Sequence, residues 1–134
     1  MNLDDFYIWL QKSEPEIEHI HALLSKLLND EPEALIGDLE EAEAWNSRAG
    51  FLLAEANSFL DQAKRHFLPT KEGNTDFDRR ILLDEACSLV RLNRDKIESL
   101  CDSLKQRLIL GESILGYLRM FKENRAIEQK KAPY

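Results

Sequence analysis

The sequence predicts an all-α protein with one domain. Turn-forming residues are scarce, with four prolines and five glycines in 134 residues, and apolar residues recur every three or four positions over most of the chain. This spacing places apolar side chains along one side of an α-helix. With 43% hydrophobic residues, the chain can bury one core but not two independent ones. We therefore expect a single helical domain over residues 1–134.

The first segment, residues 1–30, is expected to be acidic and helical. It opens with an aromatic cluster in a short helical stretch. Ser13 followed by Pro15 is typical of a helix start, with the serine as the cap and the proline in the first turn. We expect an amphipathic helix from there that stops near Asn29.

The second segment, residues 31–68, is expected to be one helix. Asp30 with Pro32 repeats the start signal. Pro69 ends the helix, because the residue before a proline avoids helical backbone angles. Residues 69–75 carry the proline and Gly-Asn signals of a surface loop. A glycine inside a helix costs about 1 kcal/mol, so breaks stay open at three positions, which are Gly37, Gly50 and Gly111.

The third segment, residues 76–125, contains no proline and can form a helix about 75 Å long. Such a helix cannot cover its own apolar side, so it needs partner helices from this chain or from other copies. We expect it to form a long antiparallel hairpin with residues 31–68, with the N-terminal helix packed across it, in an oligomeric helical assembly. The expected oligomer interface consists of Asn93, Ile97, Leu100, Leu104, Leu108, Leu115 and Leu118.

Two parts of this segment have alternative interpretations. Asn93 is a polar member of the apolar row, where it can set the register or oligomer state or lie at the edge of the buried face. The tail, residues 126–134, is basic and is expected to fray. In the alternative interpretation, this tail reaches a polyanion.

The acidity of the chain belongs to its first third. Residues 1–45 carry twelve acids and two bases, a net charge of −10, whereas residues 46–134 carry a net charge of +3, which together give −7. An acidic segment of this kind can compete with DNA or dock on a basic partner.

The compartment is expected to be the cytoplasm, with no membrane contact. No run of about 18 apolar residues exists, and the N-terminus lacks the basic start of a secretory signal. Cys87 and Cys101 would lie about 21 Å apart along one helix, whereas a disulfide needs Cα atoms within about 7 Å. We expect two buried free thiols; the alternative is a crosslink between subunits.

No enzyme, metal site or cofactor is expected. Glu16 with His19, and Glu18 with His21, have the Glu-x-x-His spacing of di-iron bundles. Such sites need a second copy of the motif and two more glutamates, but His66 has no glutamate three residues before it. The isolated glycines form no phosphate loop, and no Gly-x-Ser-x-Gly elbow is present.

The basic residues of the third segment have two interpretations. They can form a solvated face whose charges are neutralised in local ion pairs, or they can contact phosphates. Arg94 beside Asp95 favours the first interpretation. The candidate nucleic-acid contacts are Lys105, Arg107, Arg119 and Lys122.

A family resemblance rests on three runs of sequence. The run Asp102-Ser-Leu-Lys-Gln-Arg107, followed by Leu108-Ile-Leu110 and Tyr117-Leu-Arg-Met-Phe121, resembles the second half of UvsY-like phage and prophage recombination mediator proteins. The run from Leu52 to Lys64 looks like the first long helix of such proteins. The resemblance covers roughly residues 45 to 125.

This resemblance implies a ring-like homo-oligomer that binds single-stranded DNA. It would help to load a recombinase onto strands covered by a single-strand-binding protein. Lys105 and Arg107 would contact phosphates, and Arg119 and Lys122 would extend that surface. The alternative, from another class, is a helical assembly or adaptor module without nucleic-acid binding, which acts through an exposed apolar stripe.

Overall fold

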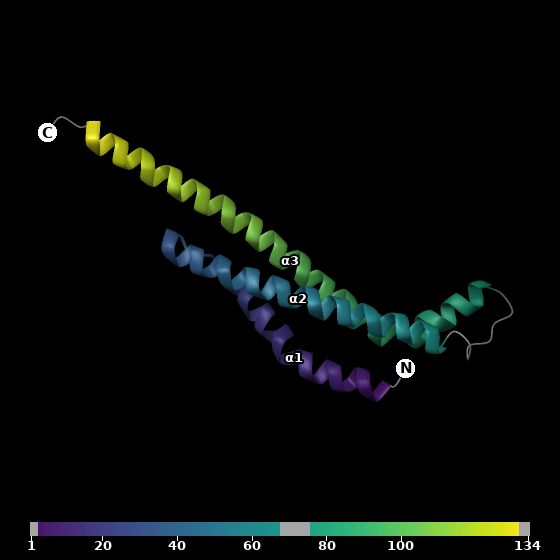
Figure 1. Ribbon diagram of the computed structural model, residues 1–134. Helices are drawn as coiled ribbons and strands as arrows, with labels where there is room; N and C mark the ends of the chain where they lie inside the picture. Colours follow the sequence, from purple (N-terminus) through teal and green to yellow (C-terminus); the bar gives the residue numbers. More distant parts are fainter. Residues whose placement is uncertain (1–2, 68–75, 132–134) are drawn as a thin grey trace.

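The described part of the chain is entirely helical. The computed structural model describes residues 3–67 and 76–131, which form three α-helices and no strand (Figure 1). Their bounds are Leu3–Ser25 for α1, Pro32–Phe67 for α2 and Asp76–Lys131 for α3. The all-α prediction is confirmed. The expected loop at 69–75 lies outside the described residues.

The helix α1 runs without interruption through Pro15, so the predicted start at Ser13 is wrong. Ser13 is buried, at 2% exposure, and its hydroxyl donates hydrogen bonds to the carbonyl oxygens of Trp9 at 2.9 Å and Leu10 at 3.1 Å. A serine that bonds back into its own helix is not acting as a cap. Proline removes one backbone hydrogen bond and bends a helix, and α1 changes direction midway along its length (Figure 1).

The start of α2 is capped by Glu31 and not by Asp30, which corrects a second expectation. The Glu31 carboxylate accepts hydrogen bonds from the backbone N–H of Ala34 at 2.9 Å and of Glu33 at 3.3 Å. These two N–H groups belong to the first turn, where no carbonyl of the helix can reach them. The negative charge of Glu31 also interacts favourably with the positive end of the helix dipole, which lies at the N-terminus of α2.

Both long helices continue across their glycines. Neither Gly37 nor Gly50 breaks α2, and Gly111 does not break α3. Gly111 instead marks a close approach between the two helices, since a methyl group at this position would overlap the side chain of Leu39. The absence of a side chain at Gly111 therefore lets α3 lie directly against α2.

The helix α3 extends to Lys131, six residues past the predicted end at residue 125. These residues are alanine, isoleucine, glutamate, glutamine and two lysines, most of which are good helix formers. The first proline after the start of α3 is Pro133. Nothing earlier in the sequence stops the helix.

The helices α2 and α3 lie side by side and run in opposite directions (Figure 1). Asn57 of α2 contacts Arg94 of α3, whereas the earlier Leu39 of α2 meets the later Gly111 of α3. The α2 side of the contact is rich in buried alanine, which lets the two backbones approach closely. Those alanines are Ala42, Ala49, Ala56 and Ala63.

Two hydrophobic clusters hold α1 against this pair. The larger cluster joins Ile20 and Leu23 of α1 to the facing sides of α2 and α3. In the smaller one, Phe6 of α1 is fully buried, and its ring meets the edge of Phe59 of α2 at a centroid distance of 5.6 Å. The aromatic cluster at the start of the sequence therefore supplies core contacts.

Candidate interaction surface on the third helix

The expected oligomer interface divides into two parts. Ile97, Leu100 and Leu104 are buried inside the chain, packed with α1 and α2. The remaining members are half-buried, namely Asn93, Leu108, Leu115 and Leu118. Since α1 and α2 of the same chain cover the first part, the three buried leucine and isoleucine side chains need no second copy to remove them from water.

Asn93 lies at the edge of the buried face. Its side-chain amide donates a hydrogen bond to the carbonyl oxygen of Leu89 on the preceding turn, at 2.9 Å. The partner therefore comes from its own helix. This geometry matches the edge alternative for Asn93.

The last part of α3 has no α2 residue opposite it. Gly111 meets Leu39, and α2 begins at Pro32, so α3 extends past the beginning of α2 (Figure 1, yellow end). Residues 119–128 are all exposed. Helix propensity alone, without tertiary packing, has to hold this end of α3 in the single chain.

A second apolar row lies on this part of α3, beside the core-facing row. It consists of Leu110, Ile114, Tyr117 and Phe121, spaced by four, three and four residues; we call it the outer row. Ile114 is half-buried, whereas Leu110, Tyr117 and Phe121 are 56%, 67% and 55% exposed. A spacing of this kind keeps side chains on one helix face.

The outer row begins inside a cavity between α3 and the end of α1. This cavity has a volume of about 970 Å³, and its apolar lining comes from Leu110 and Ile114 together with Leu24, Leu27 and Leu28. Leu27 is 94% exposed. Three leucines around an open cavity offer a binding place for an apolar side chain.

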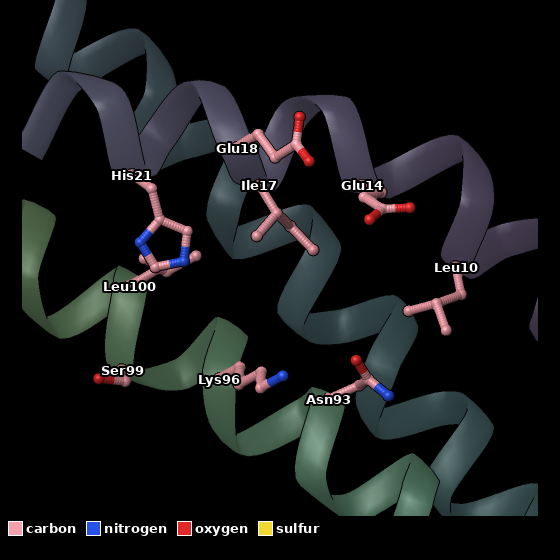
Figure 2. Close-up of a pocket in the computed structure, with 9 residues that line it drawn as sticks. All are labelled: Leu10, Glu14, Ile17, Glu18, His21, Asn93, Lys96, Ser99 and Leu100. Carbon is pink, nitrogen blue, oxygen red and sulfur yellow. The ribbon is translucent and has the colours of Figure 1, made fainter.

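A second cavity of about 430 Å³ lies further back along the same seam between α1 and α3 (Figure 2). Ser99 lines both cavities, so they are neighbours. The apolar lining comes from Leu10 and Ile17 of α1 and Leu100 of α3, and polar side chains surround it. Those polar residues are Glu14, Glu18, His21, Asn93, Lys96 and Ser99. We call the two cavities together the α1–α3 groove.

Arg107, a candidate phosphate contact, ties α1 to α3. Its Nη1 donates a hydrogen bond to the carbonyl oxygen of Lys26, just past the end of α1, at 2.8 Å. Its Nε is buried and has no hydrogen-bond partner among the described residues. A guanidinium held in this way supports the fold of the chain.

The four candidate phosphate contacts do not form one face. Lys105 and Arg107 are two residues apart, which is about 200° around a helix, so they point to different sides of α3. Arg119 and Lys122 are both exposed near the end of α3. The exposed aromatic side chains Tyr117 and Phe121 are each two residues from Arg119, about 200° around the helix, so they point away from it.

Other charged side chains are occupied locally. Arg94 donates hydrogen bonds from Nε to Asn57 Oδ1 at 2.8 Å and from Nη1 to Asp95 at 3.0 Å and Glu98 at 2.5 Å. The hydrogen bond to Asp95 raises the pKa of Arg94 above its usual value. The local ion-pair interpretation therefore holds at Arg94.

Cys87 and Cys101 are both buried, and neither forms a disulfide. Burial raises the pKa of the Cys101 thiol, and the nearby Lys105 opposes that shift only in part. A neutral buried thiol is a poor nucleophile and a poor metal ligand. Within residues 3–67 and 76–131, no group of three or more potential ligand residues is placed to hold a metal ion.

A scan of protein-family models finds no match to this sequence, and searches of the curated proteins and the solved structures find none either. The resemblance to UvsY-like proteins therefore stays a prediction. In the described part of the chain, no helix combines the length and apolar content needed to cross a membrane.

The sequence interpretation missed the outer row and the groove. The spacing of Leu110, Ile114, Tyr117 and Phe121 was present in the sequence. It was hidden because Leu108, Leu115 and Leu118 form the core-facing row in the same stretch, and the two rows overlap. The groove depends on where α1 ends, which required the tertiary structure.

Proposed function

We propose that this protein is a non-enzymatic helical assembly module that binds another protein chain through the outer row and the α1–α3 groove. The exposure of Leu110, Tyr117 and Phe121 along one side of α3 carries this proposal. Contiguous exposed apolar side chains on a soluble domain mark places of protein contact, and a helix face beside a groove suits a helical partner. In this proposal α2 and α3 form one antiparallel hairpin, which is the unit of assembly in the cytoplasm.

The proposal is tested by placing photoreactive benzoylphenylalanine at Leu110 in cells that produce the protein. Glu123 is a matched control position, because it is exposed on the same part of α3 but lies about 140° around the helix from Leu110. We expect a crosslinked protein chain, identified by mass spectrometry, from Leu110 and none from Glu123. Equal labelling at both positions, or no protein crosslinked at Leu110, would contradict the proposal.

Binding of single-stranded DNA is the second candidate function. It would make the protein a recombination accessory that assists recombinase loading as a homo-oligomer. Exposed Arg119 and Lys122 favour it, because they lie about 60° apart on one side of α3 and cations contact the phosphates of a single strand. Against it, Arg119 shares a cavity with Glu40, Glu43 and Glu112, which repel a phosphate backbone.

Oligonucleotide binding separates the two candidates. If the second holds, a labelled single strand binds at low salt and its affinity falls steeply as salt is added, because binding releases counterions. Arg119→Glu with Lys122→Glu should abolish that binding. If no binding occurs at low salt, the DNA-binding candidate is wrong and the assembly role is unaffected.

A further inference from the structure

We infer that the chain seated on the outer row is a second copy of this protein, with the two α3 helices antiparallel. This inference rests on the proposed function and names the partner of that same surface. It follows from the spacing of the outer row and from the shape of the groove at its start.

The spacing of the outer row reads the same in both directions. Its steps of four, three and four residues let an antiparallel copy place Leu110 opposite Phe121 and Ile114 opposite Tyr117. Each contact then pairs an aliphatic side chain with an aromatic one, which evens out their volumes along the interface. A parallel copy would place Phe121 against Phe121 and Leu110 against Leu110.

The antiparallel register also fills the cavity at the end of α1. With Leu110 opposite Phe121 of the second copy, that phenylalanine enters the space lined by Leu24, Leu27 and Leu28. An aromatic side chain that fills an apolar pocket is the usual centre of a strong protein interface. The two-fold symmetry repeats this contact, so Phe121 of each copy fills the cavity at the end of α1 of the other copy.

Charge does not select the partner of this groove. Its lining holds three acids, Glu14, Glu18 and Asp102, and three bases, Lys26, Lys96 and Arg107. The spacing of the outer row and the apolar cavity at the end of α1 therefore identify the partner.

The first measurement is the mass of the purified full chain by light scattering over a range of concentrations. We expect a species of twice 15.6 kDa that dissociates on dilution. Tyr117→Glu should raise the dissociation constant by about tenfold or more, because a charge replaces an interface side chain. Met120→Glu is the matched control: Met120 is 61% exposed but lies outside the outer row, so this variant should dimerise like the wild type.

The orientation is tested by cysteine crosslinking between two differently tagged proteins. In the antiparallel register, Leu110→Cys of one copy lies opposite Phe121→Cys of the other. When both copies carry the same variant, their introduced cysteines lie about 16 Å apart along the helix, which is too far for a disulfide. We expect a crosslink in the mixture and none in either variant alone. Crosslinks in the single variants alone would indicate a parallel pair and overturn the inference.

These outcomes separate the inference from the proposed function. A chain that stays monomeric at all concentrations overturns self-association, as does a dimer in which the mixed cysteines do not crosslink. The photoreactive residue at Leu110 can still capture a different protein in cells, in which case the assembly role stands. If the chain stays monomeric and the photoreactive residue at Leu110 captures no protein, both the inferred dimer and the proposed assembly role are wrong.

Discussion

Arg107 of α3 donates a hydrogen bond from Nη1 to the carbonyl oxygen of Lys26, 2.8 Å away, and so links the end of α1 to the middle of α3. This carbonyl lies just past the last residue of α1, where helix carbonyls lack partners of their own. The arginine also lines the cavity where the outer row begins. It therefore fixes the wall of the α1–α3 groove.

Replacing Arg107 by alanine should lower the free energy of unfolding by about 1 to 2 kcal/mol, because a hydrogen bond from a charged donor is lost. Lys105→Ala removes an exposed cation from the same part of α3 and should change stability by less than about 0.5 kcal/mol. Urea unfolding of both variants measures the difference. Equal stabilities would mean that the Arg107–Lys26 contact contributes nothing.

The glycines of α3 provide a second comparison. Gly116 has open space around it, whereas a methyl group at Gly111 would overlap Leu39. Gly116→Ala should raise the free energy of unfolding by about 0.5 to 1 kcal/mol through helix propensity. Gly111→Ala should lose that gain and cost about 1 kcal/mol more, because Leu39 has to move.

The Gly111 prediction has an internal control. In a Leu39→Ala background the overlapping side chain is gone, so Gly111→Ala should no longer be worse than Gly116→Ala. The free energies of unfolding of the wild type, Gly111→Ala, Leu39→Ala and the double variant form a double-mutant cycle. An unchanged penalty at Gly111 after removal of the Leu39 side chain would place the close contact elsewhere.

The helices themselves were predictable because local sequence determines them. The apolar periodicity of residues 76–125 and the proline at position 32 correctly indicated long helices, and the observed α2 and α3 start at Pro32 and Asp76. The expectation failed at Ser13 and Pro15. A serine before a proline has the same local pattern whether it caps a helix or bonds back into one, and only the burial of Ser13 against the other helices distinguishes them.

The candidate surface was less predictable than the fold. Which of two overlapping apolar rows on α3 is covered depends on how far α2 and α1 reach along it, and α1 ends at Ser25. The role of Arg107 likewise depends on a carbonyl oxygen 81 residues earlier in the chain. Neither fact has a local signature in the sequence.

The buried Cys101 thiol predicts a pH dependence of stability. Its folded pKa is raised by burial above the ordinary value of 9.0, so the unfolded chain releases this proton first as the pH increases. The contribution of the neutral Cys101 thiol to the free energy of unfolding is therefore fully present below about pH 9, and it is lost as the pH rises from there towards the folded pKa. Comparing wild type with Cys101→Ala isolates this thiol, because the other titrating groups are common to both proteins. The stability of the wild type relative to the variant should fall above pH 9; a constant difference would show that Cys101 ionises equally in both states.

Leu104 and Phe121 should respond in opposite ways to truncation. Leu104 is fully buried among α1, α2 and α3, so Leu104→Ala should lower the free energy of unfolding by about 2 to 5 kcal/mol at any protein concentration. Phe121 is exposed in the single chain, so Phe121→Ala should change the stability of dilute protein by less than about 0.5 kcal/mol. At high concentration its cost should grow, because association stabilises the wild type by mass action. Thermal unfolding at two concentrations measures this, and a cost for Phe121→Ala that does not depend on concentration would mean that its ring already packs within one chain.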